Sequence, residues 1–395
     1  MLKIIWYICL LALTLGQFGI VAGTPGSAVY AFDIFIIIFD IIGLAYFLVV
    51  KKTFKIPVMG RLFICFFLAT VISLLFSLRM YSFDAIVPGL FYLLRFSAYV
   101  FSGIIAYNMA ASGLVKPDNI RRAVVFSGIL ISLAGIVQLI LLPDFSILDP
   151  SLGWDPHKNR LASTFFDPNF TGVYLVVCLA LLFDKYYVQK KFTGADFLFF
   201  IILLVPTFLT FSRSAWAMLA VVVLIYGRSY SKKMLYASLL VAFCAYFSVP
   251  RIQTRLMGAT DPSDSARLRI ESWKKAGRII SDNPVLGVGF NNYKIAQKEY
   301  GFISEDELNS HSASGTDSSL LFVLATTGII GFAVYLVSLA LSVFIKGKLR
   351  VFSAALVLGL LVDSLFINSL FYPQIMFLIF LLIPLEEFSP EGKSL

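Results

Sequence analysis

Residues 197–227 read FLFFIILLVPTFLTFSRSAWAMLAVVVLIYG, two apolar runs separated by the short polar break Phe211-Ser-Arg-Ser-Ala-Trp216. Each run approaches the ~20 residues that a helix needs to cross a bilayer, so this stretch predicts two membrane spans joined by a tight turn. Arg213 lies in that break, and a charged side chain at membrane depth costs at least about 2.5–3.5 kcal/mol. We therefore expect Arg213 to face a protein interior or a water-filled cavity.

The composition of the rest of the chain predicts an all-α integral membrane protein. Hydrophobic residues make up 59% of its 395 residues and charged residues 14%, which is far from the balance of a soluble domain. We expect the first apolar segment to be a retained span rather than a cleaved signal peptide, because cleavage would leave the other spans without a paired topology. The twelve predicted spans are 1–21, 31–50, 62–78, 85–111, 123–142, 169–183, 196–211, 214–227, 234–249, 319–345, 351–370 and 373–386.

The distribution of cations predicts the orientation. Five loops on one side carry sixteen lysines and arginines, whereas the short loops on the other side carry four. The positive-inside rule then assigns the five loops and the N-terminus to the cytoplasm. The net charge of +9 is mostly this topological signal, so we expect no nucleic-acid partner. The sixteen cations are Lys51, Lys52, Lys55, Arg61, Lys116, Arg121, Arg122, Lys185, Lys190, Lys191, Arg228, Lys232, Lys233, Lys346, Lys348 and Arg350.

Cysteines and histidines give no sign of a disulfide, a metal site or a cofactor. The four cysteines all fall within predicted spans and lack metal-ligand spacing. The only histidines, His157 and His311, fall in predicted outer loops rather than on a helix pair.

The segment 250–318 predicts a structured extracytoplasmic loop between the ninth and tenth spans of a single membrane domain, 1–395. Its many apolar residues favour folding against the membrane body. Its best helix is 264–281, where Ile270, Trp273 and Ile280 are predicted to share one packed face that includes Arg269. Simple snorkelling or a local ion pair is the alternative reading for Arg269.

Four motifs together resemble the O-antigen ligase and Wzy-type polymerase family. They are Arg160-Leu-Ala-Ser-Thr-Phe-Phe-Asp-Pro-Asn169, the break Thr210-Phe-Ser-Arg-Ser-Ala215, Arg269-x-x-x-Trp273 followed by Asn283-Pro-Val-Leu-Gly-Val-Gly289, and the segment from Asp317 to Gly331. The resemblance covers 160–331 in order and spacing, and the twelve-span plan covers the whole chain.

This resemblance implies a membrane glycosyltransferase of the GT-C type. Such an enzyme takes glycan from a polyprenyl-diphosphate carrier, usually undecaprenyl diphosphate, and joins it to an acceptor hydroxyl outside the bacterial plasma membrane. Matching position by position assigns Arg213 and Arg269 to the carrier diphosphate, and Arg160 lies in the matched outer-loop motif. Arginine suits a diphosphate because its planar guanidinium binds phosphate oxygens bidentately.

The proton acceptor is left open between two residues. Ligases of the family have a histidine eleven residues before the first glycine of a Gly-x-x-Gly end, and counting back from Gly328 reaches Asp317 instead. Asp317 is thus a candidate base, with capping of the tenth span as its alternative role. His311, six residues earlier, is the other candidate.

The remaining choices concern Arg95 and the overall function. Arg95, inside the fourth predicted span, either binds the substrate or forms a buried pair with Asp33 or Asp40. The aspartate at the ligase histidine position favours a polymerase of lipid-linked repeat units, with a chain-length regulator as a further partner, over a ligase. A secondary transporter or flippase is the alternative of a different class, although the sequence shows no repeat of two related halves.

Overall fold

The computed structural model describes the chain except residues 24–27, 149–154, 259–264, 305–314, 346 and 390–395. The described residues are mainly helical, as predicted. Only two small antiparallel sheets occur among them, β1 (Ile20–Ala22) with β2 (Val29–Tyr30) and β3 (Phe344–Ile345) with β4 (Lys348–Leu349). The α-helices are α1 (Leu2–Thr14), α2 (Ala31–Ala45), α3 (Val58–Ser77), α4 (Phe83–Ala111), α5 (Pro117–Leu141), α6 (Pro168–Tyr187), α7 (Gly194–Leu209), α8 (Arg213–Tyr230), α9 (Lys232–Ser248), α10 (Pro250–Met257), α11 (Ser265–Asp282), α12 (Tyr293–Glu299), α13 (Ser319–Ser342), α14 (Val351–Asp363) and α15 (Pro373–Leu382).

Each predicted span contains a helix, but the helices differ in length. Six in the described part of the chain are long and apolar enough to cross a membrane: Ala31–Val50, Val58–Ser77, Phe83–Ala111, Pro117–Leu141, Pro168–Tyr187 and Ser319–Ser342. The helix pair α9 and α10, bent by 97°, would make a seventh. Shorter apolar helices such as α1 and α14 do not reach spanning length by themselves. The multi-pass membrane fold is confirmed at this level, and the number of twelve spans stays a prediction.

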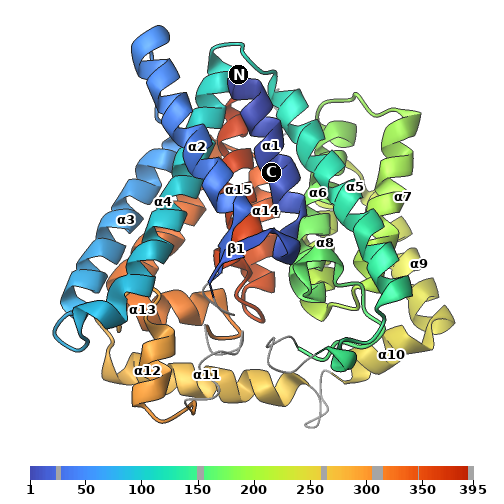
Figure 1. The fold of residues 1–395 in the computed structure, drawn as a ribbon. Coiled ribbons are helices and arrows are strands. Elements are labelled where there is room, and N and C mark those ends of the chain that lie inside the picture. The colour runs from blue at the N-terminus through green and yellow to red at the C-terminus, as the bar shows by residue number, and fades with distance from the viewer. Residues whose placement is uncertain (24–27, 149–154, 259–264, 305–314, 346, 390–395) are drawn as a thin grey trace.

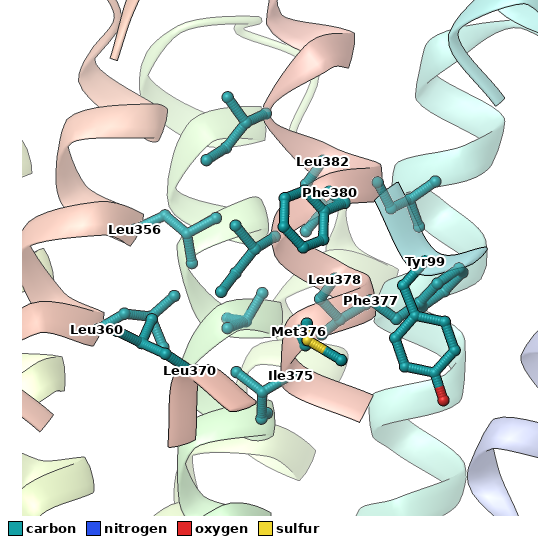
Figure 2. Close-up of a cluster of buried hydrophobic side chains, with 14 of the residues drawn as sticks. Tyr99, Leu356, Leu360, Leu370, Ile375, Met376, Phe377, Leu378, Phe380 and Leu382 are labelled. Carbon is teal, nitrogen blue, oxygen red and sulfur yellow. The ribbon is translucent and has the colours of Figure 1, made fainter. Parts of the chain in front are cut away.

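The core of the bundle lies around α15, whose ten residues are all buried. Figure 2 shows Phe377 of this helix beside Tyr99 of α4, while Leu356 and Leu360 of α14 lie on the other side of α15. A helix that is apolar on every face gains most from being enclosed by other helices, because it has no polar face to turn outward. The other helices surround α15, and aromatic rings such as Phe63 and Phe96 pack edge-on against Phe380.

One end of the bundle, which we call the α11 end, is covered by α10, α11 and α12 (Figure 1). These helices come from the segment 250–318, and α11 packs against α13. The segment therefore folds on the membrane body, as expected, and α11 differs from the predicted 264–281 by one residue at each boundary. The assignment of this end to the outer side of a membrane stays a prediction.

The glycine-rich segment 283–289, which follows α11, packs against an interruption in α13. Gly328 interrupts α13 with φ 63° and ψ −170°, and a Cβ there would lie 2.2 Å from the carbonyl carbon of Val285. The amide of Ile329 donates to Pro284 O at 2.8 Å, and that of Val288 donates to Ala325 O at 3.0 Å. Only a glycine fits a left-handed position with such a close backbone neighbour. Part of the matched motif thus serves as scaffold for the α11 end.

Candidate active site

The polar break between α7 and α8 lies at the α11 end. Phe211 adopts a left-handed conformation with φ 49°, which ends α7, and the Ser212 hydroxyl accepts from the amide of Ala215 at 3.4 Å to cap α8. Arg213 is the first residue of α8, is half-buried, and donates from Nη1 to the carbonyl oxygen of Arg255 at 3.2 Å. The break therefore places the Arg213 side chain against α10. This agrees with the expectation that Arg213 faces protein and not lipid.

Arg160 connects the outer-loop motif to this break. Its Nε donates to Thr210 O at 2.9 Å, and its Nη2 donates to Phe211 O at 3.4 Å and to Asn169 Oδ1 at 3.1 Å. The same Asn169 oxygen accepts from the Ser212 hydroxyl at 2.9 Å. Two motifs that are about fifty residues apart in the sequence thus meet around the exposed carbonyls of the break, and Arg160 has a structural part in holding them.

Helix α10 brings two arginines that the sequence analysis did not assign. Arg251 donates from Nη2 to Lys158 O at 2.6 Å and lies 4.2 Å above the ring of Phe211. Arg255 follows one turn later, on the same face of a helix that begins at Pro250. Two cations four residues apart in a short amphipathic helix are a weak signal, which is why α10 was not singled out.

Helix α11 positions Arg269, which is half-buried, and fixes the start of α13. Ser272 Oγ accepts from the amide of Asp317 at 3.1 Å, and Trp273 Nε1 donates to Asp317 O at 3.4 Å. The prediction that Ile270 lies on the packed face of α11 is wrong, because Ile270 is 49% exposed. Ile279, which was not assigned to that face, is fully buried. The physical reason is that α11 does not pack evenly along its length: Ala276 and Ile279 are buried, whereas the first turns extend beyond that contact.

Asp317 is half-buried and does not cap α13. The cap is Ser318, whose hydroxyl accepts from the amide of Leu321 at 3.4 Å. Burial raises the pKa of the Asp317 carboxyl, with a smaller contribution from other carboxylates, while the Arg269 guanidinium acts in the opposite direction. A carboxyl with a raised pKa beside a guanidinium is suited to accepting a proton near neutral pH.

A second carboxyl, Asp363, lies at the end of α14 and is fully buried. Neither of its oxygens has a hydrogen bond of normal geometry, although the hydroxyls of Ser214 and Ser369 lie beside it and Arg269 is close enough to interact electrostatically. The sequence analysis missed Asp363 because it follows an apolar run without any motif. Buried polar groups usually have well-formed hydrogen bonds, so a buried carboxyl without them near Arg269 marks a polar site.

Three arginines of the site repel Arg160. We call Arg160, Arg213, Arg251, Arg255 and Arg269 the arginine cluster. Burial, followed by the charges of Arg255, Arg269 and Arg251, lowers the pKa of Arg160 to about 9 against the opposing effect of Asp167. A guanidinium does not lose its proton near neutral pH, so Arg160 stays charged, and its positive neighbours add repulsion to the cost of its burial. An anion bound among these residues would relieve that repulsion.

Asp155, His157 and Asp167 form a group that the sequence did not predict. One ligand atom from each lies within 4.8 Å of the others, which is a spacing that could hold a metal ion. However, burial and the charge of Arg160 lower the pKa of His157 to about 4, and Asp167 already accepts from the amides of Asn169 and Phe170 at 2.6 and 3.3 Å. The positive potential that acts on His157 opposes a cation at the same place, and we assign none.

The two other predicted site residues lie elsewhere. Arg95 pairs with Asp33, with Nη2 to Oδ2 at 2.7 Å and Nε to Oδ1 at 3.0 Å, and also donates to Ala28 O. Tyr99 donates to the same carboxylate at 2.5 Å. The structure thus shows the buried-pair alternative for Arg95 and does not bring it into the arginine cluster. His311 lies outside the described residues, so its role stays a prediction.

The fold and this site define a helical membrane protein with a polar, arginine-rich site at one end of its bundle. Residues 198–336 match the family model described as O-Antigen ligase, which confirms the resemblance to the O-antigen ligase and Wzy-type polymerase family. The matched range contains Arg213, Arg255, Arg269 and Asp317, but neither Arg160 nor Asp363. No curated protein matches the chain. At a coarse level this match supports a membrane enzyme of the ligase and polymerase type.

Proposed function

We propose that the protein polymerises polyprenyl-diphosphate-linked oligosaccharide units into a surface polysaccharide. The observation that carries this proposal is the arginine cluster, in which the charges of Arg251, Arg255 and Arg269 act together on Arg160, and Arg269 also interacts with the carboxyls of Asp317 and Asp363. Arg213 joins the cluster through its hydrogen bond to Arg255 O. A diphosphate ester fits such a site because it brings concentrated negative charge on oxygens that guanidiniums bind bidentately.

The bond changes follow from this arrangement. The acceptor hydroxyl attacks the anomeric carbon of the donor sugar, the bond from that carbon to the phosphate oxygen breaks, and the polyprenyl diphosphate leaves with the electron pair. Arg213 and Arg269 stabilise the charge that develops on the leaving diphosphate. Asp317 accepts the proton of the attacking hydroxyl, and Arg160 keeps the α7–α8 break in place while adding its own charge.

Asp363 has a supporting part in this proposal. Its carboxyl is fully buried between Arg269 and the hydroxyl of Ser214, the residue next to Arg213. We infer that it sets the orientation of Arg269, because the nearest opposite charge determines where a flexible guanidinium rests. An aspartate in this place acts through Arg269 and needs no contact with the substrate.

A ligase that transfers the glycan to a lipid A core or another acceptor is the second candidate. The match to the ligase model favours it, whereas Asp317 at the position of the ligase histidine favours the polymerase. Both reactions use the same donor and the same diphosphate site. They differ in the acceptor, and that difference makes them separable by experiment.

The test is reconstitution of the purified protein in vesicles with a lipid-linked repeat unit and no ion gradient. We expect a ladder of products that grows by one repeat unit at a time, detected by gel electrophoresis. Transfer of a single glycan only when a lipid A core is supplied would identify a ligase. Movement of the lipid between leaflets without a new glycosidic bond would refute both enzymes and support a transporter or flippase.

A labelling experiment tests the side of the membrane on which the site lies. Thr254 of α10 is exposed at the α11 end, and the variant should be made without the two exposed cysteines, Cys65 and Cys244. We expect Thr254→Cys to react with a membrane-impermeant maleimide in intact cells, whereas Lys233→Cys reacts only after the membrane is opened. The reverse pattern would refute the proposed orientation.

A further inference from the structure

A groove lies far from the candidate active site, between α1, α5, α6 and α7. Its volume is about 710 Å³, which is in the range of sites that hold small molecules or lipid chains. The groove is lined by the first turns of α5 and α7 and the last turns of α6, so it lies near the end of the bundle opposite the α11 end (Figure 1). The charge count assigns that end to the cytoplasm.

The groove is apolar inside and open at its edge. Buried leucines such as Leu10, Leu181 and Leu182 form its inner wall, while Leu11 and Phe126 at its edge are 58% and 57% exposed. Apolar surface of this kind on a membrane helix faces lipid chains and not water. A groove that opens among such side chains is therefore suited to an apolar chain from the bilayer.

Of the three cations that line the groove, one has no ion pair with any residue that the structure describes. Arg121 is neutralised by Glu386 at 2.8 Å and Asp118 at 3.3 Å, and Lys185 by Asp196 at 2.5 Å. Arg122, by contrast, is exposed and has no ion pair among the described residues. Both acidic residues that line the groove are thus already paired, and the charge left over there is positive.

We propose that this groove binds an anionic phospholipid, with an acyl chain along the inner wall and the phosphate on Arg122. Basic pockets between membrane helices on the cytoplasmic side are suited to acidic headgroups for this reason. Asn119, which is also exposed at this end, offers an amide that can donate to a phosphate or glycerol oxygen. The proposal does not depend on the enzymatic activity, because no residue of the arginine cluster lines the groove.

Native mass spectrometry of the full-length protein in mild detergent tests this proposal. Phosphatidylglycerol and phosphatidylcholine with identical acyl chains are added separately, and the bound fraction is compared. We expect the wild type to retain at least about five times more phosphatidylglycerol, and Arg122→Gln to lose this preference. The matched control is Arg228→Gln, because Arg228 is an exposed cation in the last turn of α8 that does not line the groove.

A second variant tests the acyl-chain part. Ala195 lines the groove and is exposed, so Ala195→Trp should fill it and lower retention of both lipids; Leu130→Phe is a milder replacement if the tryptophan variant does not fold. The proposal is overturned if the wild type shows no headgroup preference, if Arg228→Gln removes it as fully as Arg122→Gln, or if the filled groove retains lipid normally. A co-purifying protein that occupies the groove and excludes lipid would also overturn it.

Discussion

Two half-buried arginines, Arg95 in the bundle and Arg160 at the α11 end, differ in what surrounds the guanidinium. Arg95 lies inside the bundle with its charge balanced by Asp33, and its donors reach that carboxylate and a backbone carbonyl. Arg160 lies at the α11 end, where Arg255, Arg269 and Arg251 all repel it. Both positions are costly for a charge, but only the second leaves positive potential for a ligand. The comparison teaches that the neighbours of a buried charge, more than its depth, distinguish a structural arginine from a binding one.

The largest expected effect concerns the carboxyl beside the arginine cluster. Asp317→Asn keeps the size of the side chain but cannot accept a proton, so we expect polymerisation to fall by about 10²–10⁴-fold. The measurement is the rate of chain extension with purified protein and lipid-linked repeat units. Glu271→Gln is the matched control, because Glu271 is an exposed acid on α11 paired with Arg267.

The companion variant His311→Ala decides between the two candidate bases. The more severe of the two defects identifies the base, since only one group needs to accept the proton. Normal polymerisation in both variants would mean that arginine-assisted departure of the diphosphate proceeds without a protein base. Asp363→Asn in the same assay should have a smaller effect than Asp317→Asn if its part is to orient Arg269.

The next effect tests the structural side of the comparison. Asp33→Asn leaves the Arg95 guanidinium buried without its counter-charge, and breaking such a pair costs about 3–5 kcal/mol of folding stability. Replacing both residues, Asp33→Leu with Arg95→Met, should restore most of that loss. Thermal unfolding in detergent measures the stability, and the activity of the double variant measures function. A stable but inactive double variant would return Arg95 to the substrate site.

Smaller losses are expected from changes of shape within the arginine cluster. Arg213→Lys and Arg269→Lys keep the charge but lose the planar fork, so each should lower activity by more than about tenfold without affecting folding. Arg267→Lys is the control on the same helix, because Arg267 is exposed and paired with Glu271 at 3.0 Å. Activity near the wild type in both test variants would show that neither arginine binds the diphosphate bidentately.

The sequence predicted the elements of the fold better than their contacts. Apolar composition located the six described helices that are long enough to cross a membrane, because burial in lipid demands long apolar segments. The partners of individual side chains were harder to predict from the sequence. The ion pair of Arg95 with Asp33 was one of several alternatives, and α13 is capped by Ser318 and not by Asp317. Neighbouring residues with similar chemistry can exchange such roles within one residue of register, and no pattern in a single sequence separates them.

The candidate site was predicted in part, through motifs and not through charge. Arg160 and Arg213 were identified because each lies in a motif with a matching order and spacing, and the structure brings them together around the break. Arg255 and Asp363 were missed, since an arginine in a short amphipathic helix and an acid at the end of an apolar helix are both common. Their significance appears only when three helices meet at the α11 end.

The smallest effect separates the carboxyl of Asp33 from that of Asp317 by the pH dependence of stability. Burial raises the pKa of Asp317 in the folded protein, so its contribution to stability is present below the ordinary range of an aspartate and is lost as the pH rises through the raised value. At pH 7 the wild type therefore carries an unfavourable term that Asp317→Asn removes. We expect the asparagine variant to have the higher Tm at pH 7, with the difference vanishing toward pH 4.

Melting temperatures across this pH range give the sign directly. Asp33→Asn should lower the Tm at pH 7, in contrast to Asp317→Asn, because Asp33 balances Arg95 in a closed pair whereas Asp317 lies near Arg269 in a site with excess positive charge. A lower Tm for Asp317→Asn at pH 7 would mean that attraction to Arg269 outweighs burial. Asp317 would then be a structural counter-ion like Asp33, and the distinction between the two regions would rest on the arginines alone.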